Sequence, residues 1–212
     1  MMIRHHPDLH RLLEFSAGNL GDAEALCIRL HLDLCGECRN RVDALDSLGA
    51  VVMERQPELG LSPSVFERVL ERIDADRAAP PASAGGATGV LTRILGTDLS
   101  SVPWKQSLKN VGVVDLTSRF PAQGHRVLLL KLAAGGTAPA HTHRGEEITV
   151  VLQGAFADQQ GVFHQGDFVV LDCQDNHRPV AVGQEDCITL SVLSAPLRLT
   201  GRFTRLLNPF IR

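Results

Sequence analysis

The spacing His31-x3-Cys35-x2-Cys38 constrains this chain most, because it puts three metal-binding side chains at positions i, i+4 and i+7. These positions share one face of an α-helix. At ~1.5 Å per residue, a straight helix would hold His31 and Cys38 about 10 Å apart. One ion cannot bridge that gap with ligand distances of ~2.3 Å. We therefore expect the helix to end near Cys35, turn through Gly36-Glu37 and restart near Cys38.

The chemistry of these three residues indicates zinc. Two thiolates and an imidazole suit a tetrahedral Zn²⁺ ion. The motif itself lacks a fourth ligand, which His5 or His6 can supply, whereas Cys27 lies on the same helix face but farther from the thiolate pair. The alternative interpretation is a helix with two buried structural thiols and a polar histidine, because free cysteine is often buried.

The apolar pattern predicts four helices in residues 1–77. They cover residues 9–17, capped by Asp8, residues 22–34, residues 37 or 38 to 55, and a segment that begins at 62–64 with Pro just inside its start. Residues 1–77 carry nine Arg and no Lys against fourteen Asp and Glu, a formal balance of −5. An acidic helical module indicates a protein partner with a basic surface and disfavours DNA.

The fourth of these helices allows two interpretations. Its apolar side is narrow and consists of Val65, Phe66, Val69, Leu70 and Ile73. Such a helix either offers a surface to a partner protein or docks on its own domain, and the pattern does not separate these alternatives.

The composition of the whole chain narrows the class of protein. The 212 residues carry a formal net charge of −3, which gives no electrostatic case for nucleic-acid binding. Five cysteines without a disulfide-like spacing fit a reducing compartment and metal binding. The beginning of the chain has no signal pattern, and the apolar runs are shorter than the ~18 residues of a membrane span. We therefore expect a soluble cytoplasmic protein.

The organisation changes after the helical segment. Residues 78–90 contain no charge and consist mainly of Ala, Pro, Gly and Ser, which is typical of a flexible linker. From Leu91 onward, short β-type runs alternate with glycine-containing turns, which predicts a sandwich or jelly-roll barrel. The expected fold is multidomain: a small all-α zinc-binding domain (1–77), a linker (78–90) and an all-β domain (91–212).

A second group of metal-binding residues lies in the β-rich part. His141 and His143 point to the same face of a strand, Glu147 follows, and Gly166-Asp167 precedes His177. Three imidazoles and a carboxylate can hold zinc, iron, manganese or nickel. If all four bind, the site is closed; if Glu147 swings away, a position opens for chemistry. The competing interpretation, a chance His-x-His on a surface strand, is weakened by the flanking glycines.

This second group resembles the cupin superfamily. The first cupin motif, G-x5-H-x-H-x3-E-x6-G, is matched at every position from Gly135 to Gly154. The second, G-x5-P-x-G-x2-H-x3-N, is matched only at Gly166 and His177. The usual Pro, Gly and Asn are replaced here by Asp172, Gln174 and Ala181. The resemblance implies a jelly-roll barrel whose single metal is bound by His141, His143, Glu147 and His177.

The first group resembles zinc-binding anti-sigma factors, which carry an N-terminal His and then H-x3-C-x2-C. The match is His31, Cys35 and Cys38, and the resemblance implies His6 as the N-terminal ligand, with His5 as the alternative. The order of the two motifs resembles the ChrR-type anti-sigma factors over essentially the whole chain. So do Ile-Arg-His-His near the start and Arg-Leu-Leu-x-Pro-Phe near the end.

That resemblance implies a function. The N-terminal zinc domain would sequester an extracytoplasmic-function (ECF) type sigma factor and keep it from core RNA polymerase. The cupin domain, also with zinc, would sense singlet oxygen or organic peroxide and act as a sensor, not as an enzyme. Damage at the cupin site would be passed to the first domain, and Cys173 and Cys187 are either reporters of it or plain core residues.

Two other functions compete with this one. The first is a metal-dependent cupin enzyme, such as a dioxygenase or isomerase, with an N-terminal regulatory zinc module. The second is a nucleic-acid-binding zinc module, which the acidic balance of residues 1–77 disfavours.

Overall fold

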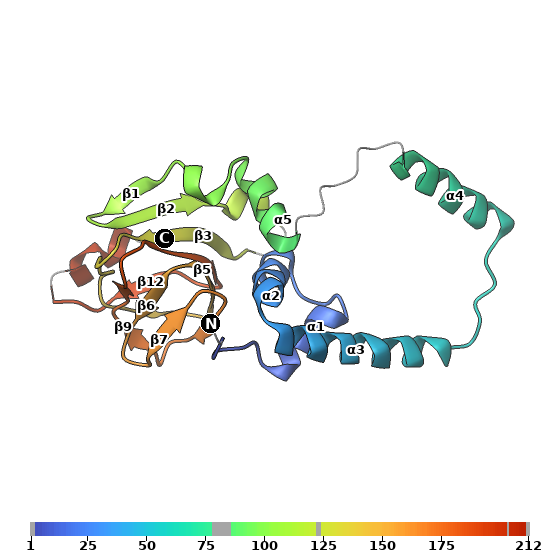
Figure 1. Cartoon of the computed structure of the whole chain (residues 1–212), viewed down its shortest axis with the longest axis horizontal. Coiled ribbons are helices and arrows are strands. Elements are labelled where there is room, and N and C mark those ends of the chain that lie inside the picture. Colours follow the sequence, from blue (N-terminus) through green and yellow to red (C-terminus); the bar gives the residue numbers. More distant parts are fainter. Residues whose placement is uncertain (1–2, 78–85, 122–123, 203, 211–212) are drawn as a thin grey trace.

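The computed structural model describes residues 3–77, 86–121, 124–202 and 204–210, and shows a helical part beside a β-barrel (Figure 1). The four predicted helices are confirmed, with small shifts at their ends. They are α1 (Leu9–Ser16), α2 (Asp22–Leu34), α3 (Gly36–Glu54) and α4 (Pro63–Arg77). A fifth helix, α5 (Gly86–Leu95), was not predicted. Asp8 caps α1 as expected, because its carboxylate accepts a hydrogen bond of 2.8 Å from the backbone N–H of Arg11.

The break between α2 and α3 is tighter than the predicted turn. Only Cys35 leaves the helical conformation, with φ −103° and ψ 101°, and α3 already begins at Gly36. The expected turn through Gly36-Glu37 is therefore wrong. One extended residue suffices, because Cys35 is also the N-cap of α3, and its sulfur accepts a hydrogen bond of 3.4 Å from the N–H of Cys38.

Helix α5 corrects part of the predicted linker. Residues 78–85 lie outside the described residues, but Gly86–Val90 are helical, so a flexible linker over this part is wrong. The helix continues past Leu91, where strands were expected to begin. Leu91 is buried, with Val90, Ile94 and Leu95 packed on the same core, and α5 contacts α2. Their spacing follows a helical period, which the Gly- and Ala-rich context concealed.

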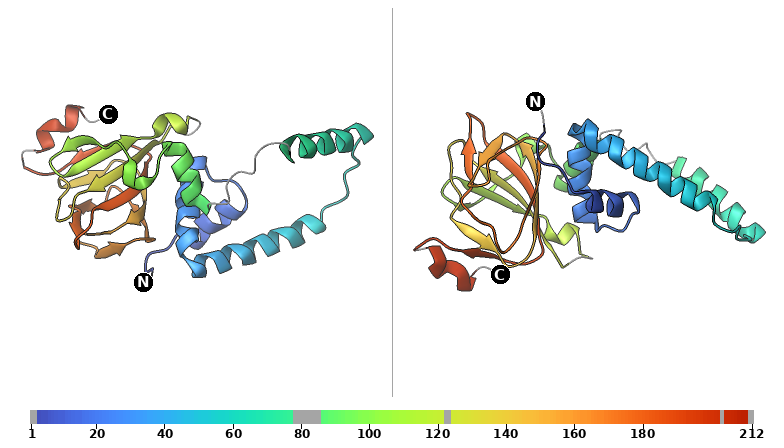
Figure 2. Two further views of the ribbon diagram at one scale, coloured as in Figure 1. Left: turned by 45° about the horizontal axis from the view of Figure 1, so that its top comes forward. Right: turned by 90° about the horizontal axis from the view of Figure 1, so that it is seen from below.

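Helices α3 and α4 extend away from the rest of the molecule. The second half of α3 points away from the barrel, and α4 lies apart from it in every view (Figures 1 and 2). The apolar side chains of α4 that the sequence singled out are mostly exposed; Phe66, for example, is 65% exposed. Docking of α4 on its own domain is therefore not observed, and the first alternative, a surface open to a partner, remains.

The β-rich part forms three antiparallel sheets. The six-stranded sheet has the order β1 (Lys105–Leu108), β2 (Val111–Asp115), β3 (Arg126–Leu132), β11 (Cys187–Leu193), β5 (Glu147–Gln153) and β8 (Phe168–Leu171). One three-stranded sheet contains β10 (Val180–Val182), β6 (Ala155–Ala157) and β7 (Val162–His164). The other contains β12 (Leu197–Leu199), β4 (His141–His143) and β9 (Asn176–His177). This arrangement confirms the predicted jelly-roll class.

The six-stranded sheet is covered on both faces. Along β11, Ile188, Leu190 and Val192 belong to a core shared with α2, whereas the alternate residues face the barrel interior. All seven residues of β11 are buried, and only Thr189 and Ser191 among them are polar, because the strand is covered on both faces. The helical part and the barrel therefore share one apolar core. An ion pair of 2.5 Å between Arg11 and Glu146 also links them.

Helices long and apolar enough to cross a bilayer do not occur among the residues that the structure describes.

Two candidate metal centres

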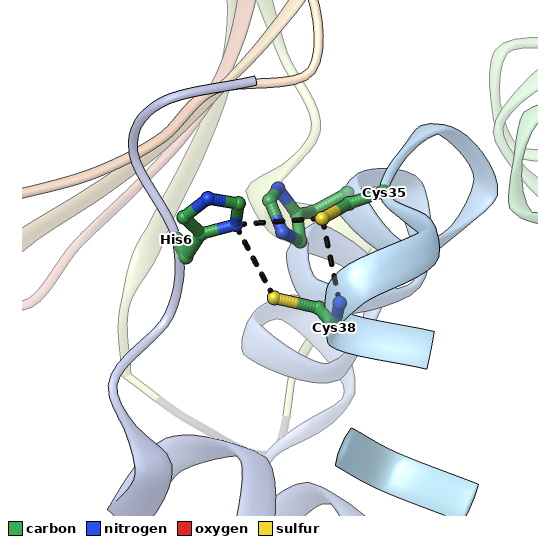
Figure 3. Close-up of side chains that lie close together, drawn as sticks. His6, Cys35 and Cys38 are labelled. Atoms are coloured by element: carbon green, nitrogen blue, oxygen red, sulfur yellow. Dashed lines mark hydrogen bonds between the residues drawn. The ribbon is translucent and has the colours of Figure 1, made fainter. Parts of the chain in front are cut away.

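The N-terminal centre gathers one donor atom from each of four residues: His6, His31, Cys35 and Cys38. All four atoms lie within 4.8 Å of one another. The Nδ1 atom of His6 is 3.4 Å from both sulfurs (Figure 3). His6 comes from the extended segment before α1, His31 from the last turn of α2, and the cysteines from the α2–α3 break. The break thus brings together the i, i+4 and i+7 side chains that a straight helix would separate.

The choice between the two upstream histidines follows from their contacts. His6 points at the thiols, whereas the ring of His5 packs on Phe163 of β7, with 4.6 Å between ring centroids. Cys27 is fully buried in the shared core, and burial raises its thiol pKa above the usual range. It does not belong to the four-residue group. The structure therefore brings together the set with His6 and leaves both His5 and Cys27 out.

His31 shows why this group fits a cation. Its Nδ1–H donates a hydrogen bond of 2.6 Å to the carbonyl of Gly166, so Nε2 carries the lone pair. That Nε2 is buried and has no hydrogen-bond partner in the part of the chain described. Burial lowers the pKa of His31, which keeps the ring neutral. A buried, unpaired imidazole lone pair beside two sulfurs is what a bound divalent metal would satisfy.

The thiols support the same conclusion. Burial, together with the hydrogen bond and charge of Cys35, raises the pKa of Cys38 to about 12 when no cation is present. Two adjacent thiolates are unstable alone, whereas a metal ion ionises both. The donor set of two sulfurs and two imidazoles fits a four-coordinate soft or borderline metal.

The barrel centre gathers three imidazoles around one point. The Nε2 atom of His177 lies 2.9 Å from Nε2 of His141 and 3.3 Å from Nε2 of His143. Strand β4 supplies the first two, and β9 pairs with it so that His141 and His177 are register partners. All three are buried, and they form the second group with metal-binding geometry among the described residues.

Two of these rings are oriented through a hydrogen bond of their other nitrogen, and the third has a carboxylate nearby. His141 Nδ1 lies 2.7 Å from the carbonyl of Pro139, and His177 Nδ1 lies 2.8 Å from the buried carboxylate of Asp158. His143 Nδ1 lies 3.1 Å from Glu147. Oxygen acceptors at Nδ1 of His141 and His177 leave the lone pairs of these two rings at Nε2, where the three rings converge. Burial lowers the pKa of His141 to about 4, so this ring is neutral at neutral pH and cannot share a proton with its neighbours. The converging lone pairs would repel one another, and a metal ion between them would remove this repulsion.

Glu147 holds a different position from the three histidines. Its carboxylate contacts Nδ1 of His143 and accepts a hydrogen bond of 2.8 Å from Thr149, which is 2.6 Å from Ser191. Burial opposes ionisation of Glu147, but the hydrogen bond and charge of His143 outweigh it and hold the pKa of Glu147 below its usual range. The described geometry thus gives this carboxylate an orienting contact, and its donor atoms are not in the converging group.

A cavity of about 630 Å³ opens beside the barrel centre. His141, Glu147 and His177 line one side of it, and the remaining walls are mainly apolar side chains from β2, β3, β11 and β12. Its size lies within the range of small-molecule sites. Two of the three imidazoles, those of His141 and His177, therefore face a cavity large enough for a small molecule.

Sequence reasoning missed two carboxylates that support these centres. Asp158 orients His177, and Asp167 binds the backbone of the segment that carries His6. Asp167 was visible only as part of a Gly-Asp turn signal, and Asp158 gave no signal because it precedes a loop of unremarkable composition. Cys187 is buried in the barrel and Cys173 is exposed.

The geometry describes a helical module with a four-ligand thiol-containing centre, joined to a cupin-type barrel with a three-histidine centre. Residues 93–196 match the family described as the ChrR cupin-like domain. The whole chain is 37% identical to the anti-sigma-E factor ChrR of Cereibacter sphaeroides, over 100% of both chains. The protein therefore belongs to the ChrR family of anti-sigma factors.

A solved structure of a complex agrees with this assignment. The crystal structure of Rhodobacter sphaeroides SigE in complex with the anti-sigma ChrR matches with a TM-score of 0.75 and 35% identity. The match covers 91% of this chain and 100% of that one. An RmlC-like cupin protein from Ralstonia eutropha matches 50% of this chain and 71% of its own, with 27% identity and a TM-score of 0.41.

Proposed function

We propose that this protein binds an ECF-type sigma factor through its helical part and keeps it from core RNA polymerase. The observation that carries the proposal is the full-length likeness to ChrR, which has been crystallised with SigE. The proposal places the protein in the cytoplasm, where thiolates stay reduced.

The surface of α3 and α4 supports a protein partner. Large apolar side chains are exposed along both helices and their connection; on α3 and the connection they are Leu48, Val51, Val52, Met53, Leu59 and Leu61. On α4 they are Phe66, Val69, Leu70 and Ile73. Exposed apolar side chains in such number mark an interaction surface in a protein that is otherwise well packed. The acidic balance of residues 1–77 favours a partner with basic residues around its apolar contact.

We infer that both centres hold zinc, with Glu147 as the fourth ligand in the barrel. In the N-terminal centre the zinc ties the short helices together, since α1 has only eight residues. In the barrel, a small oxidant such as singlet oxygen or an organic peroxide reaches the centre through the cavity. Damage there loosens the helical part and releases the sigma factor, so the barrel acts as a sensor and not as an enzyme.

Binding is tested by isothermal calorimetry with candidate ECF sigma factors from the same genome. The double variant Phe66→Asp/Val69→Asp puts charge on the exposed side of α4, and we expect at least ~100-fold weaker binding, as for central apolar contacts. The matched control is Leu206→Asp, an exposed leucine in the short helix Thr204–Phe210, far from α4 in Figure 1. Equal binding by both variants would contradict the proposed surface.

A metal-dependent enzyme remains a second candidate function, and one observation favours it. Glu147 lies off the converging imidazoles, and the cavity reaches His141 and His177, so a coordination position is accessible. The discriminating measurement is oxygen consumption by the iron-loaded protein with small organic substrates. Sustained turnover would support catalysis, whereas sigma-factor binding with no turnover supports the sensor.

A further inference from the structure

The turn between β7 and β8 contacts the N-terminal segment through a buried carboxylate. Asp167 is only 1% exposed, although it lies in a turn of the barrel. One carboxylate oxygen accepts hydrogen bonds from the backbone N–H groups of Arg4, at 2.9 Å, and His5, at 3.1 Å. The other accepts a bond of 2.7 Å from the N–H of His164 in the barrel. Asp167 therefore joins the two parts of the molecule directly.

The same turn reaches the N-terminal centre at a second point. The carbonyl of Gly166 accepts the 2.6 Å hydrogen bond from Nδ1–H of His31. Gly166 has φ +91°, and an added Cβ would lie 2.7 Å from Ile3 and 3.3 Å from Leu34. The backbone conformation favours glycine here, and the N-terminal segment and the end of α2 pack closely against it.

Strand β8 completes the attachment. The N–H of Phe168 donates a hydrogen bond of 3.0 Å to the carbonyl of His5. The peptide groups on both sides of His5 are therefore bonded to the barrel, and His6 is the next residue. Of the four donor residues in the N-terminal centre, one follows this anchored segment and another is oriented by the Gly166 carbonyl.

We propose that Asp167 and Gly166 are positioning residues of the N-terminal metal centre, so that the barrel sets the metal affinity of a site outside it. Groups that orient metal-binding histidines change metal affinity about 10–100-fold when removed. Strand β8, which follows this turn, also pairs with the strand that carries Glu147 of the barrel centre, since Leu171 is the register partner of Glu147. The inference rests on a metal at the N-terminal centre and deepens the proposed function by naming the structural link between the two centres.

The test is a cobalt titration of the full-length protein with a competing chelator. Only a site with thiolates gives the intense sulfur-to-cobalt charge-transfer absorption, so this band reports Cys35 and Cys38 and not the all-histidine centre. For Asp167→Asn, which replaces an acceptor oxygen by an amide, we expect at least ~10-fold weaker cobalt binding at this band. The matched control is Asp186→Asn, whose carboxylate accepts a bond of 3.0 Å from the N–H of Ala134 within the barrel; we expect a change below twofold.

A second variant guards against a folding defect. Arg4→Pro removes the N–H that binds Asp167 and leaves every barrel residue in place. We expect the same weakening of the thiolate band, with the thermal unfolding of the barrel unchanged. If Arg4→Pro binds cobalt like the parent, or if folded Asp167→Asn does, the positioning role is wrong. No sigma factor takes part, so that outcome leaves the proposed partner untouched; absence of the thiolate band in the parent would instead refute the metal assignment itself.

Discussion

The two metal centres differ in what holds their ligands. The barrel centre uses three histidines on two paired strands, and oxygen acceptors orient His141 and His177. The N-terminal centre joins three separate pieces: an extended segment, the end of α2 and the start of α3. Paired strands hold the first ligand set, whereas the second set is assembled from segments that meet only in the folded molecule, where Cys35 and Cys38 lie in the shared core. The comparison teaches that local strand pairing positions the barrel ligands, whereas tertiary packing of distant segments positions the N-terminal ligands.

The largest expected effect comes from breaking the N-terminal centre. Cys38→Ser replaces one of the two sulfurs and should abolish zinc binding at the N-terminal centre. The helices should then lose stability, because structural zinc supplies about 10–16 kcal/mol of binding free energy that is also folding free energy. We expect faster amide hydrogen exchange through α1 and α3 while the barrel strands stay protected. Hydrogen exchange with mass spectrometry checks this.

The control for this change is Cys173→Ser, which removes an exposed thiol in a barrel loop. It should leave both the exchange pattern and the zinc content unchanged. Retention of protected helices in Cys38→Ser would break the comparison, because the helices would then be stable without their metal.

Breaking the barrel centre should have a smaller structural effect. His177→Ala removes one of three converging imidazoles. Loss of a group that only orients a ligand weakens metal binding by up to about 100-fold, so loss of this ligand should weaken it by more than ~100-fold. Because the sheets keep their apolar core, we expect the barrel to stay folded and sigma-factor binding to persist, with loss of the response to oxidant. Metal analysis and a binding assay before and after photosensitised singlet oxygen check this; unfolding of the barrel would show that its metal is structural too.

An intermediate change sharpens the comparison. Asp158→Asn keeps the size of a side chain that has no exposed surface and lies 2.8 Å from His177, but replaces the charged acceptor. The barrel should bind metal about 10–100-fold more weakly. Chelator competition measures this, and the thiolate band of the cobalt-loaded protein is the internal reference. Parent-like affinity would mean that the sheet alone orients His177.

The smallest effect concerns the thiols outside the centres. Burial, with the nearby charge of Glu185, raises the pKa of Cys187 to about 12, so at pH 8 only about one thiol in 10⁴ is ionised. Cys173 is exposed. In the native protein, iodoacetamide should therefore modify Cys173 at least ~1000-fold faster than Cys187, as measured by peptide mass spectrometry. Rapid modification of Cys187 would revive it as a direct reporter of oxidants.

The local pattern of the chain was enough for most helices and strands. The 3.6-residue stripes located α2 at Asp22–Leu34, and the short β-type runs between glycine-containing turns indicated the strands of the barrel. The ligand spacing also selected His31, Cys35 and Cys38 and the three barrel histidines. By contrast, α5 was missed, since four apolar residues among Gly and Ala do not outweigh a linker-like composition.

The sequence by itself determined the classes of fold, the two donor sets and their order along the chain, because these depend on residue type and short-range spacing. Only the tertiary structure decided which upstream histidine faces the thiols, where Glu147 lies, and that Asp158 and Asp167 support the centres. These contacts join residues up to 163 positions apart. The physical reason is that the orientation of a side chain depends on the packing of distant segments, and for His6 that packing is the attachment of its own backbone to the turn at Gly166 and Asp167.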